Sequence, residues 1–517
     1  MHFLAELKGS KFRFLQGYEV DNSAFALSKQ ESVISHLGKW LVECSEEGLR
    51  VNETSQFQVF IHRVTDAQVL VSSSLLSLVK SLSKKPCLSW KYFIDYIALG
   101  PFPTVLTPFE GVQYLAPGVI SSQKGFCKND NSSRRCGGGV LLQHIEQYLN
   151  ENIPSESYAG LEYSGGLEST ILLNALHRLK PEKVKLLHIN DSKSGTSDDL
   201  SHVQRTAEKY NCELVVLDFG ERSPFRAVKL SKGMPNFPHP GLVNMEYIEH
   251  TFKLVQNSNI TMVNGAGGDA IFCSRPQKAL PYELLRSGRV FSFVNSLSNL
   301  SSCYRSPLLT MMKEAVVEYK GLANKLNDPK GFLLREMGCI DIIRQDYLTE
   351  SLYYRNLIGM PVDENLTKSD RRLGALVNLY QMTTSPLSAF PGRYQYPFLS
   401  PSVLSLGLNV APEKLLKGKV DRHFLRKAAY DRYGDESVWG TRKGGVTGLT
   451  QRAMLHNKQD VLDVLLNGPL VEKGVVDVVR IERLVDEVSV GARKCPHFLI
   501  NLFSANLFIR HWEGNYA

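Results

Sequence analysis

The sequence predicts a protein of mixed α+β and α/β class, with paired strands in the amino-terminal part, a parallel α/β sheet in the middle and helices toward the carboxyl end. Three observations lead to this prediction. Residues 57–76 read as paired strands, and residues 163–263 alternate short aliphatic strands with helices. Residues 331–517 look largely helical, with an amphipathic helix expected over residues 498–512. Alternating strands and helices are typical of a parallel sheet, because each parallel connection needs a crossover that covers a sheet face.

The elements of the central sheet follow one another at short intervals. After a first strand that ends near Tyr163, we expect a helix, a strand, a helix and two further strands over residues 171–179, 184–190, 198–210, 213–219 and 260–263. Thr196 and Asp199 have the spacing of a capping box at the start of the second helix. Each strand is aliphatic, as expected when both sheet faces are covered. Glu162 departs from this pattern, which places it either at the edge of the sheet or facing a site.

A serine-glycine-glycine loop lies between the first strand and the first helix. Residues 163–170 read Tyr-Ser-Gly-Gly-Leu-Glu-Ser-Thr, and the helix is expected to start near Ser169. The glycines Gly165 and Gly166 allow a tight turn close to a ligand, while Ser164 and Ser169 supply hydroxyls and the helix N-terminus supplies unpaired N–H groups. This arrangement favours pyrophosphate binding, with an ordinary turn as the alternative. An enzyme built on such a loop splits ATP between its α and β phosphates.

A second glycine-rich loop follows the last of these strands. Gly265, Gly267 and Ala270 satisfy the dinucleotide-binding pattern G-x-G-x-x-A. An oxidoreductase is not favoured, because the loop comes late in the chain and no strand with an acidic residue follows about twenty positions on. Asp269 comes directly after the glycines and, with Glu168 of the first loop, supplies the carboxylate oxygens that Mg²⁺ prefers. We therefore expect Glu168 and Asp269 to share a metal ion, with a helix N-cap as the alternative for Asp269.

The order of several motifs resembles the synthetase domain of asparagine synthetase and its relatives in the ATP pyrophosphatase superfamily. The motifs lie at residues 164–169, 188–190, 197–199, 265–272, 396–400, 425–428 and 439–445. Two positions depart from the usual form of the family, because Glu168 and Ser400 stand where it has aspartate. The resemblance covers roughly residues 1–455 and implies an ATP-dependent ligase that forms an amide and releases AMP and pyrophosphate.

The resemblance also implies roles for individual residues. ATP and its pyrophosphate are expected to contact both glycine-rich loops and a strand end, through Ser164, Gly165, Gly166, Glu168, Ser169, His188, Ile189, Asn190, Gly265 and Gly267. Mg²⁺ is expected between Glu168 and Asp269. Lys443 is the candidate catalytic residue, because both reaction steps concentrate negative charge that a fixed cation stabilises. Its neighbours Gly444 and Gly445 let this loop approach the phosphates.

The amino-terminal third resembles the family's glutaminase domain but lacks its nucleophile. Residues 100–118 resemble the end of that domain, which implies a glutaminase-like, Ntn-type antiparallel β-sandwich. Glutamine-hydrolysing members carry a cysteine directly after the initiator methionine, whereas His2 stands there in this chain and the first cysteine is Cys44. Because the hydrolysis needs a thiolate, we expect no ammonia release. The predicted domains are a degenerate glutaminase-like domain (1–122), a linker (123–139) and the synthetase domain (140–517).

Without ammonia, the nitrogen must come from an amine of the substrate. Within the family, β-lactam synthetases and lasso-peptide cyclases work this way, and residues 265–272 and 390–452 resemble lasso macrolactam synthetases. Ala266 stands where the β-lactam enzymes place a catalytic tyrosine. The resemblance implies a lasso precursor peptide as substrate, joined from its N-terminal amine to an Asp or Glu side chain, and the leader-removing protease as a candidate partner. A β-lactam-like or other small-molecule amide synthetase and, because of Glu168, an inactive peptide-binding scaffold are the alternatives.

Composition disfavours several other classes of protein. The chain has 517 residues, 43% of them hydrophobic, and a formal net charge of +8 that is not gathered in a basic tract. We therefore expect no nucleic-acid binding. The chain has neither an apolar run of 18 residues nor a signal-like leader, so membrane insertion and secretion are not expected. Its nine scattered cysteines are typical of reduced thiols, which predicts a cytoplasmic protein.

Overall fold

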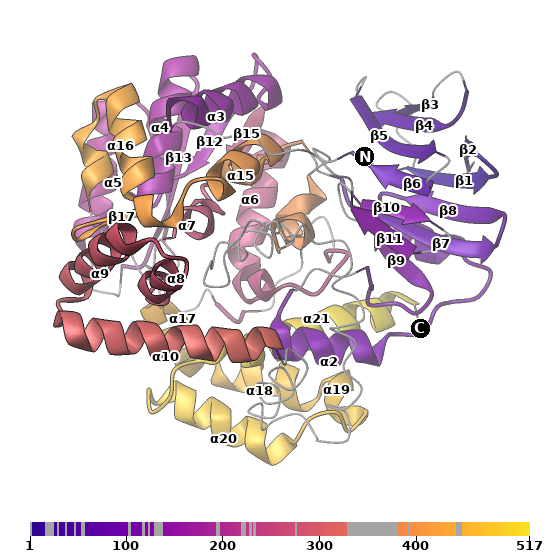
Figure 1. Cartoon of the computed structure of the whole chain (residues 1–517). Coiled ribbons are helices and arrows are strands. Elements are labelled where there is room, and N and C mark those ends of the chain that lie inside the picture. Colours follow the sequence, from indigo (N-terminus) through magenta and orange to yellow (C-terminus); the bar gives the residue numbers. More distant parts are fainter. Residues whose placement is uncertain are drawn as a thin grey trace.

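The computed structural model describes residues 3–516 except for 16–24, 28–29, 37–38, 46–47, 53–56, 102–104, 116–118, 123–124, 129–137, 193–196, 219–223, 227–229, 231–233, 274–276, 328–380, 391 and 441–446. Two antiparallel sheets lie on one side of the molecule and a helix-covered parallel sheet lies on the other, with further helices below (Figure 1). The predicted combination of amino-terminal paired strands and a parallel α/β sheet is confirmed.

The amino-terminal strands form two antiparallel sheets. The first has the order β2 (Lys11–Phe14), β1 (Leu4–Lys8), β8 (Gln68–Ser72), β7 (Val59–Thr65) and β9 (Val112–Leu115). The second has the order β11 (Gly125–Lys128), β10 (Val119–Ser122), β6 (Gly48–Val51), β5 (Lys39–Ser45), β4 (Val33–His36) and β3 (Phe25–Leu27). Leu7, Val42 and Val71 belong to one buried cluster fed by both sheets, so the sheets pack face to face. Residues 57–76 contain the expected pair, β7 and β8, and then enter helix α1 (Leu75–Ser81).

The central sheet is parallel throughout. Its order is β14 (Glu213–Asp218), β13 (Val184–Asn190), β12 (Tyr158–Glu162), β15 (Ile260–Val263) and β16 (Tyr394–Gln395). Leu161 packs toward one buried cluster, while Leu187 and Met262 pack toward another on the opposite face. Both faces are therefore covered, as the aliphatic strands predicted. Glu162 ends β12, the central strand, and so does not lie at the edge of the sheet.

Helices from distant parts of the chain cover this sheet. On one face lie α3 (Gly138–Asn152), α4 (Leu167–Leu179), α5 (Ser197–Lys209), α15 (Pro401–Leu408) and α16 (His423–Tyr433), and on the other lies α6 (Met245–Asn257) (Figure 1). Within the predicted linker 123–139, residues 125–128 form β11 and α3 begins at Gly138. Residues 129–137 lie outside the described part, as does Thr196 of the expected capping box.

The remaining described elements lie outside the three sheets and the helices already named, and most belong to the carboxyl-terminal half. They are α2 (Trp90–Leu99), η1 (Pro240–Asn244), α7 (Gly268–Ile271), α8 (Leu280–Arg286), α9 (Val290–Tyr304), α10 (Leu308–Asn327), η3 (Pro386–Ala389), η4 (Pro397–Leu399), η5 (Pro412–Lys414), the hairpin β17 (Leu416–Lys417) and β18 (Val420–Asp421), η6 (Glu436–Trp439), α17 (Thr447–His456), α18 (Lys458–Leu466), α19 (Pro469–Glu472), α20 (Val478–Ser489) and α21 (His497–Tyr516). Among the helices of the described part, none is long and apolar enough to cross a membrane.

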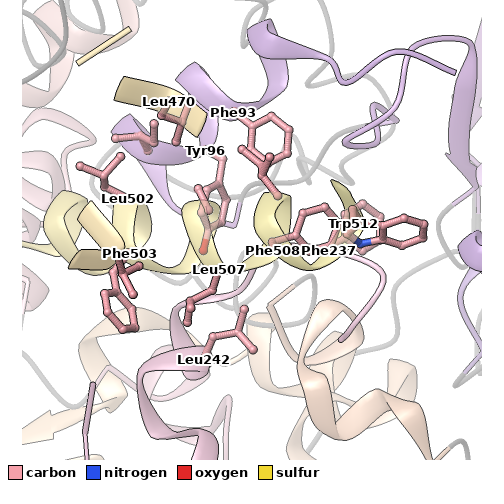
Figure 2. Close-up of a cluster of buried hydrophobic side chains, with 14 of the residues drawn as sticks. Phe93, Tyr96, Phe237, Leu242, Leu470, Leu502, Phe503, Leu507, Phe508 and Trp512 are labelled. Carbon is pink, nitrogen blue, oxygen red and sulfur yellow. The ribbon is translucent and has the colours of Figure 1, made fainter. Parts of the chain in front are cut away.

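Helix α21 lies at the centre of the largest hydrophobic cluster. The sequence predicted an amphipathic helix over residues 498–512, which is wrong, because most side chains between Leu499 and Ile509 are buried. Figure 2 shows the reason: Phe93 and Tyr96 of α2 lie on one side of α21, and Leu242 of η1 lies on the other. A helix covered on several sides needs no polar face.

Candidate active site

The serine-glycine-glycine loop connects the carboxyl end of β12 to helix α4. Gly165 takes a left-handed conformation with a φ of 73°, which a side chain would strain. Helix α4 begins at Leu167, two residues before the expected start near Ser169, and its N-cap Gly166 offers no side chain to the first N–H groups. These N–H groups and the positive end of the helix dipole are therefore available to an anion.

The two serines of the loop differ in exposure. Ser169 is buried, and its hydroxyl donates to the backbone oxygen of Gly166 at 3.0 Å. Ser164 is exposed, and its Oγ accepts a hydrogen bond from the N–H of Gly166 at 3.4 Å. Ser164 can thus reach a bound phosphate, whereas Ser169 stabilises the turn. The contact of Ser169 with ATP stays a prediction.

Glu168 and Asp269 come together from the two glycine-rich loops. Strands β12 and β15 are parallel neighbours, so the loops that follow them leave the sheet at the same edge. Glu168 lies in the first turn of α4 and Asp269 in the first turn of α7. Nη1 of Arg422 donates to both carboxylates, at 2.5 Å from Glu168 Oε1 and 2.9 Å from Asp269 Oδ1. A single cation can therefore bridge the two side chains.

The second loop packs directly on Glu168. A β-carbon at Gly265 would lie 2.8 Å from Cβ of Glu168, and one at Gly268 would lie 2.5 Å from its Cγ. These separations are shorter than carbon atoms tolerate, so the absence of side chains at both positions is what lets the loops touch. Gly267, with a φ of 93°, faces Leu399 instead. The roles of Gly265 and Gly267 at ATP stay predictions.

The paired carboxylates favour a bound cation. The pKa of Glu168 is raised to about 7, mainly because the side chain is buried and also because Asp269 lies beside it, while Arg422 opposes the shift. Mg²⁺ takes hard oxygen ligands, usually one or two carboxylates completed by phosphates and water. In the described part of the chain, no group of three or more potential ligands occurs. Glu168 and Asp269 thus fit Mg²⁺ shared with phosphates, provided that Arg422 moves aside.

Arg422 was not predicted from the sequence. It precedes α16 in a left-handed conformation with a φ of 50°, and its Nε donates to Asp421 Oδ2 at 2.7 Å. Asp421 Oδ1 also accepts from Arg426 at 2.9 Å, and Arg426 donates to the backbone oxygens of Val438 and Gly440. Arg426 thereby fixes the end of η6 next to the segment that carries the expected active-site lysine. The sequence held no clear signal for Arg422, because it lies just before α16 and reaches Glu168 from a distant part of the chain.

The end of β13 presents two of its three predicted residues at the edge of the sheet. Ile189 is 40% exposed and Asn190 is partly exposed at the last position of the strand. His188 is buried, and its Nδ1 lies 2.9 Å from the backbone oxygen of Tyr163, so the imidazole supports the first loop. Lys443, with Gly444 and Gly445, lies outside the described residues.

Glu162 is a further acidic residue at the carboxyl end of the parallel strands. Its Oε1 accepts a hydrogen bond from the hydroxyl of Tyr247 on α6, and its Oε2 accepts one from the side-chain amide of Asn264. Asn264 opens the second glycine-rich loop, and its Oδ1 accepts from the N–H of Ala266 at 2.6 Å. The pKa of Glu162 is raised to about 7, mainly because of burial, which these two hydrogen bonds partly offset. Its mismatch with the aliphatic strand was the sequence signal for this position.

The carboxyl-terminal part of this assembly is similar to a known family. Residues 392–510 match the model of the asparagine synthase family, whose members are ATP-dependent amide-forming ligases. The match includes Arg422, Arg426 and Lys443, but the two glycine-rich loops precede it.

Other comparisons add little to this family match. No curated protein matches the chain significantly. Among solved structures, a U34-tRNA thiolase NcsA from Methanococcus maripaludis with its [4Fe-4S] cluster is similar at 13% sequence identity and a TM-score of 0.19. The matched region covers 37% of this chain and 61% of that structure, which is less than two thirds of its length.

Proposed function

We propose that the protein is an ATP-dependent, AMP-forming ligase that closes a macrolactam ring in a lasso precursor peptide. The observation that supports it most is the convergence of Glu168 and Asp269 on one cation position, beside the open N-terminus of α4. The asparagine synthase family match in residues 392–510 supports amide formation with ATP. The peptide substrate and the ring rest on the sequence resemblance.

The residues of this site have separate roles in adenylation and in the amide formation that follows. The N–H groups at the start of α4 and the hydroxyl of Ser164 bind phosphate oxygens, while Glu168 and Asp269 would hold Mg²⁺, which would neutralise charge on the phosphates. The substrate carboxylate attacks the α-phosphorus, and pyrophosphate leaves. The N-terminal amine then attacks the acyl carbon, and AMP departs as the amide forms. Lys443 is proposed to stabilise the negative charge that develops in both steps.

An amine from the substrate, rather than ammonia, is the proposed nitrogen source. The residue after Met1 is His2 instead of cysteine. Burial raises the pKa of Cys44, the first cysteine of the chain, which is the wrong direction for a thiolate nucleophile. Among the described residues of the amino-terminal sheets, Cys44 is thus a poor candidate nucleophile, which supports a nitrogen that the substrate brings.

A peptide-binding scaffold without catalysis is the second candidate function. It is favoured by Arg422, which occupies the position between Glu168 and Asp269 that Mg²⁺ requires. A β-lactam-like or other small-molecule amide synthetase is less favoured, because Ala266 provides no phenol in the second loop. The leader-removing protease is proposed as a partner, whether the protein is the lasso-peptide ligase or the peptide-binding scaffold.

One experiment separates these functions. The purified protein is incubated with ATP, Mg²⁺ and a linear core peptide that has a free N-terminal amine and an Asp or Glu acceptor, and both pyrophosphate release and peptide mass are followed. The ligase yields pyrophosphate and a peptide lighter by one water. Peptide binding without pyrophosphate supports the scaffold, and pyrophosphate release with a small amino acid alone supports the small-molecule synthetase.

A further inference from the structure

Glu162 is placed where an ordinary structural residue would be apolar. It is the last residue of the central strand β12, paired with Leu187 of β13, and Leu161 before it is fully buried. A carboxylate in the middle of a covered sheet costs free energy unless it is well hydrogen bonded. Such a residue calls for an explanation beyond folding.

The hydrogen bonds of Glu162 leave room for a cationic partner. Tyr247 and Asn264 each donate one hydrogen bond to it, whereas an ionised carboxylate can accept about four. Within the described part of the chain, no Lys, Arg or His side chain forms an ion pair with Glu162. The residue keeps partial exposure at the carboxyl end of β12, although its carboxylate is largely enclosed by its neighbours.

The surroundings of Glu162 connect it to the candidate active site. Asn264 links its carboxylate to the backbone of Ala266 in the second glycine-rich loop, which also carries Asp269. Among the described residues, the titratable groups that interact with it are phenols: Tyr247 from α6 and Tyr396 from the segment after β16. Burial raises the pKa of both phenols, and the carboxylate raises them further, so both are neutral at pH 7. A positively charged amine is the complement that this arrangement lacks.

We propose that Glu162 binds the attacking amine of the substrate as an ammonium ion and accepts one of its protons before the carbon–nitrogen bond forms. This inference rests on the proposed function, since it assigns a residue to the second step of that reaction. Ala266 has no side-chain group that could accept a proton at the second loop, and Glu162 reaches that loop from the neighbouring strand through Asn264.

The step balances without a further reactant. The ammonium gives one proton to a carboxylate oxygen of Glu162 and becomes a neutral amine. Its nitrogen attacks the acyl carbon, so that a carbon–nitrogen bond forms and the bond from that carbon to the AMP oxygen breaks, with the electron pair leaving on the phosphate oxygen. The proton that the nitrogen loses goes to the departing phosphate, and Glu162 returns its proton to solvent. A carboxylate whose pKa is raised to about 7 suits such a transfer near neutral pH.

Substitution of Glu162 by glutamine tests the inference, because glutamine keeps the shape but accepts no proton. The assay uses the full chain with ATP, Mg²⁺ and the linear core peptide, and separates pyrophosphate exchange, which reports adenylation, from amide formation. We expect Glu162→Gln to reduce amide formation by about 10² to 10³ and adenylation by much less. Hydroxylamine, which is uncharged near neutral pH and needs no prior deprotonation, should trap the acyl-adenylate in both proteins at similar rates.

A second variant, Tyr247→Phe, tests the same role in case Glu162→Gln does not fold. Tyr247→Phe removes a hydrogen bond that lowers the pKa of Glu162, so the limb of the amide-formation rate that rises with pH should move to higher pH. Tyr394→Phe is the matched control, because the Tyr394 hydroxyl is buried with no hydrogen-bond partner in the described structure. Its pH profile should coincide with that of the natural protein.

Failure of the proposed ligase function and failure of the proposed role of Glu162 give different results. If the natural protein shows no pyrophosphate exchange with any carboxylate substrate, the proposed function fails. If exchange is normal but Glu162→Gln slows amide and hydroxamate formation equally, or slows neither, the role of Glu162 is overturned. An unchanged pH profile in Tyr247→Phe would also overturn it, because a purely structural carboxylate would not set that profile.

Discussion

The raised pKa of Glu162 predicts a specific loss of stability as pH increases. The protonated form is favoured in the folded protein, where the pKa is about 7, relative to the unfolded chain, where it is near the ordinary value of 4.5. Between these values the folded state binds more protons than the unfolded state, so the free energy of unfolding falls as pH rises. The stabilisation is complete below about pH 4.5 and is lost above about pH 7.

The size of this effect follows from the two pKa values. With about 1.4 kcal/mol per pKa unit, the contribution of Glu162 should fall by about 2.5 kcal/mol between pH 5 and pH 8. This figure is an upper one, because the side chain is only partly buried. Urea unfolding at both pH values, with the natural protein and Glu162→Gln, measures it as the difference between the two pH dependences.

A charge-matched control isolates Glu162 from the other titrating groups. Glu182 is exposed in the connection between α4 and β13, so Glu182→Gln removes the same charge without changing a buried site. We expect the pH dependence of Glu182→Gln to parallel that of the natural protein and that of Glu162→Gln to be flatter. Three parallel curves would refute the reasoning, because they would mean that Glu162 has an ordinary pKa in the folded state.

Three other changes test the site. Lys443→Ala should lower pyrophosphate release by about 10² to 10³ while far-UV circular dichroism stays unchanged, and near-normal release would remove Lys443 from the mechanism. Glu168→Asp should keep Mg²⁺-dependent activity and Glu168→Gln should abolish it, and equal rates in both variants would exclude Glu168 as a metal ligand. Arg426→Met should destabilise the protein by about 3 kcal/mol or more in urea unfolding, because the backbone oxygens of Val438 and Gly440 lose a buried donor, and a loss below about 1 kcal/mol would contradict this.

Local patterns were sufficient to predict the elements around the first loop. The aliphatic runs of β12, β13 and β14 and the glycines after β12 follow from backbone preferences that act over a few residues, and the structure contains these elements close to the predicted bounds. The spacing of Glu168 and Asp269 at the ends of two parallel strands also placed them at one edge of the sheet. These features depend little on the rest of the chain.

Contacts between distant segments could not be predicted in the same way. Arg422 reaches Glu168 across 254 residues of sequence, and no local pattern assigns a guanidinium to a site so far along the chain. The environment of Glu162 likewise depends on Tyr247 and Asn264, which the fold brings from α6 and from the end of β15. Helix α21 was expected to have a polar face, because its own sequence does not reveal that α2 and η1 bury it.

The position of α21 also couples the amino-terminal sheets to the rest of the described structure. Trp512 of this last helix packs edge-on against Phe109 at 4.8 Å between ring centroids, and Phe508 packs against Phe93. The amino-terminal region thus buries aromatic side chains of the last helix and helps to stabilise the carboxyl-terminal helices. A chain shortened to begin at residue 140 would expose these aromatic side chains to water, so the amino-terminal sheets contribute to the stability of the carboxyl-terminal helices whatever else they do.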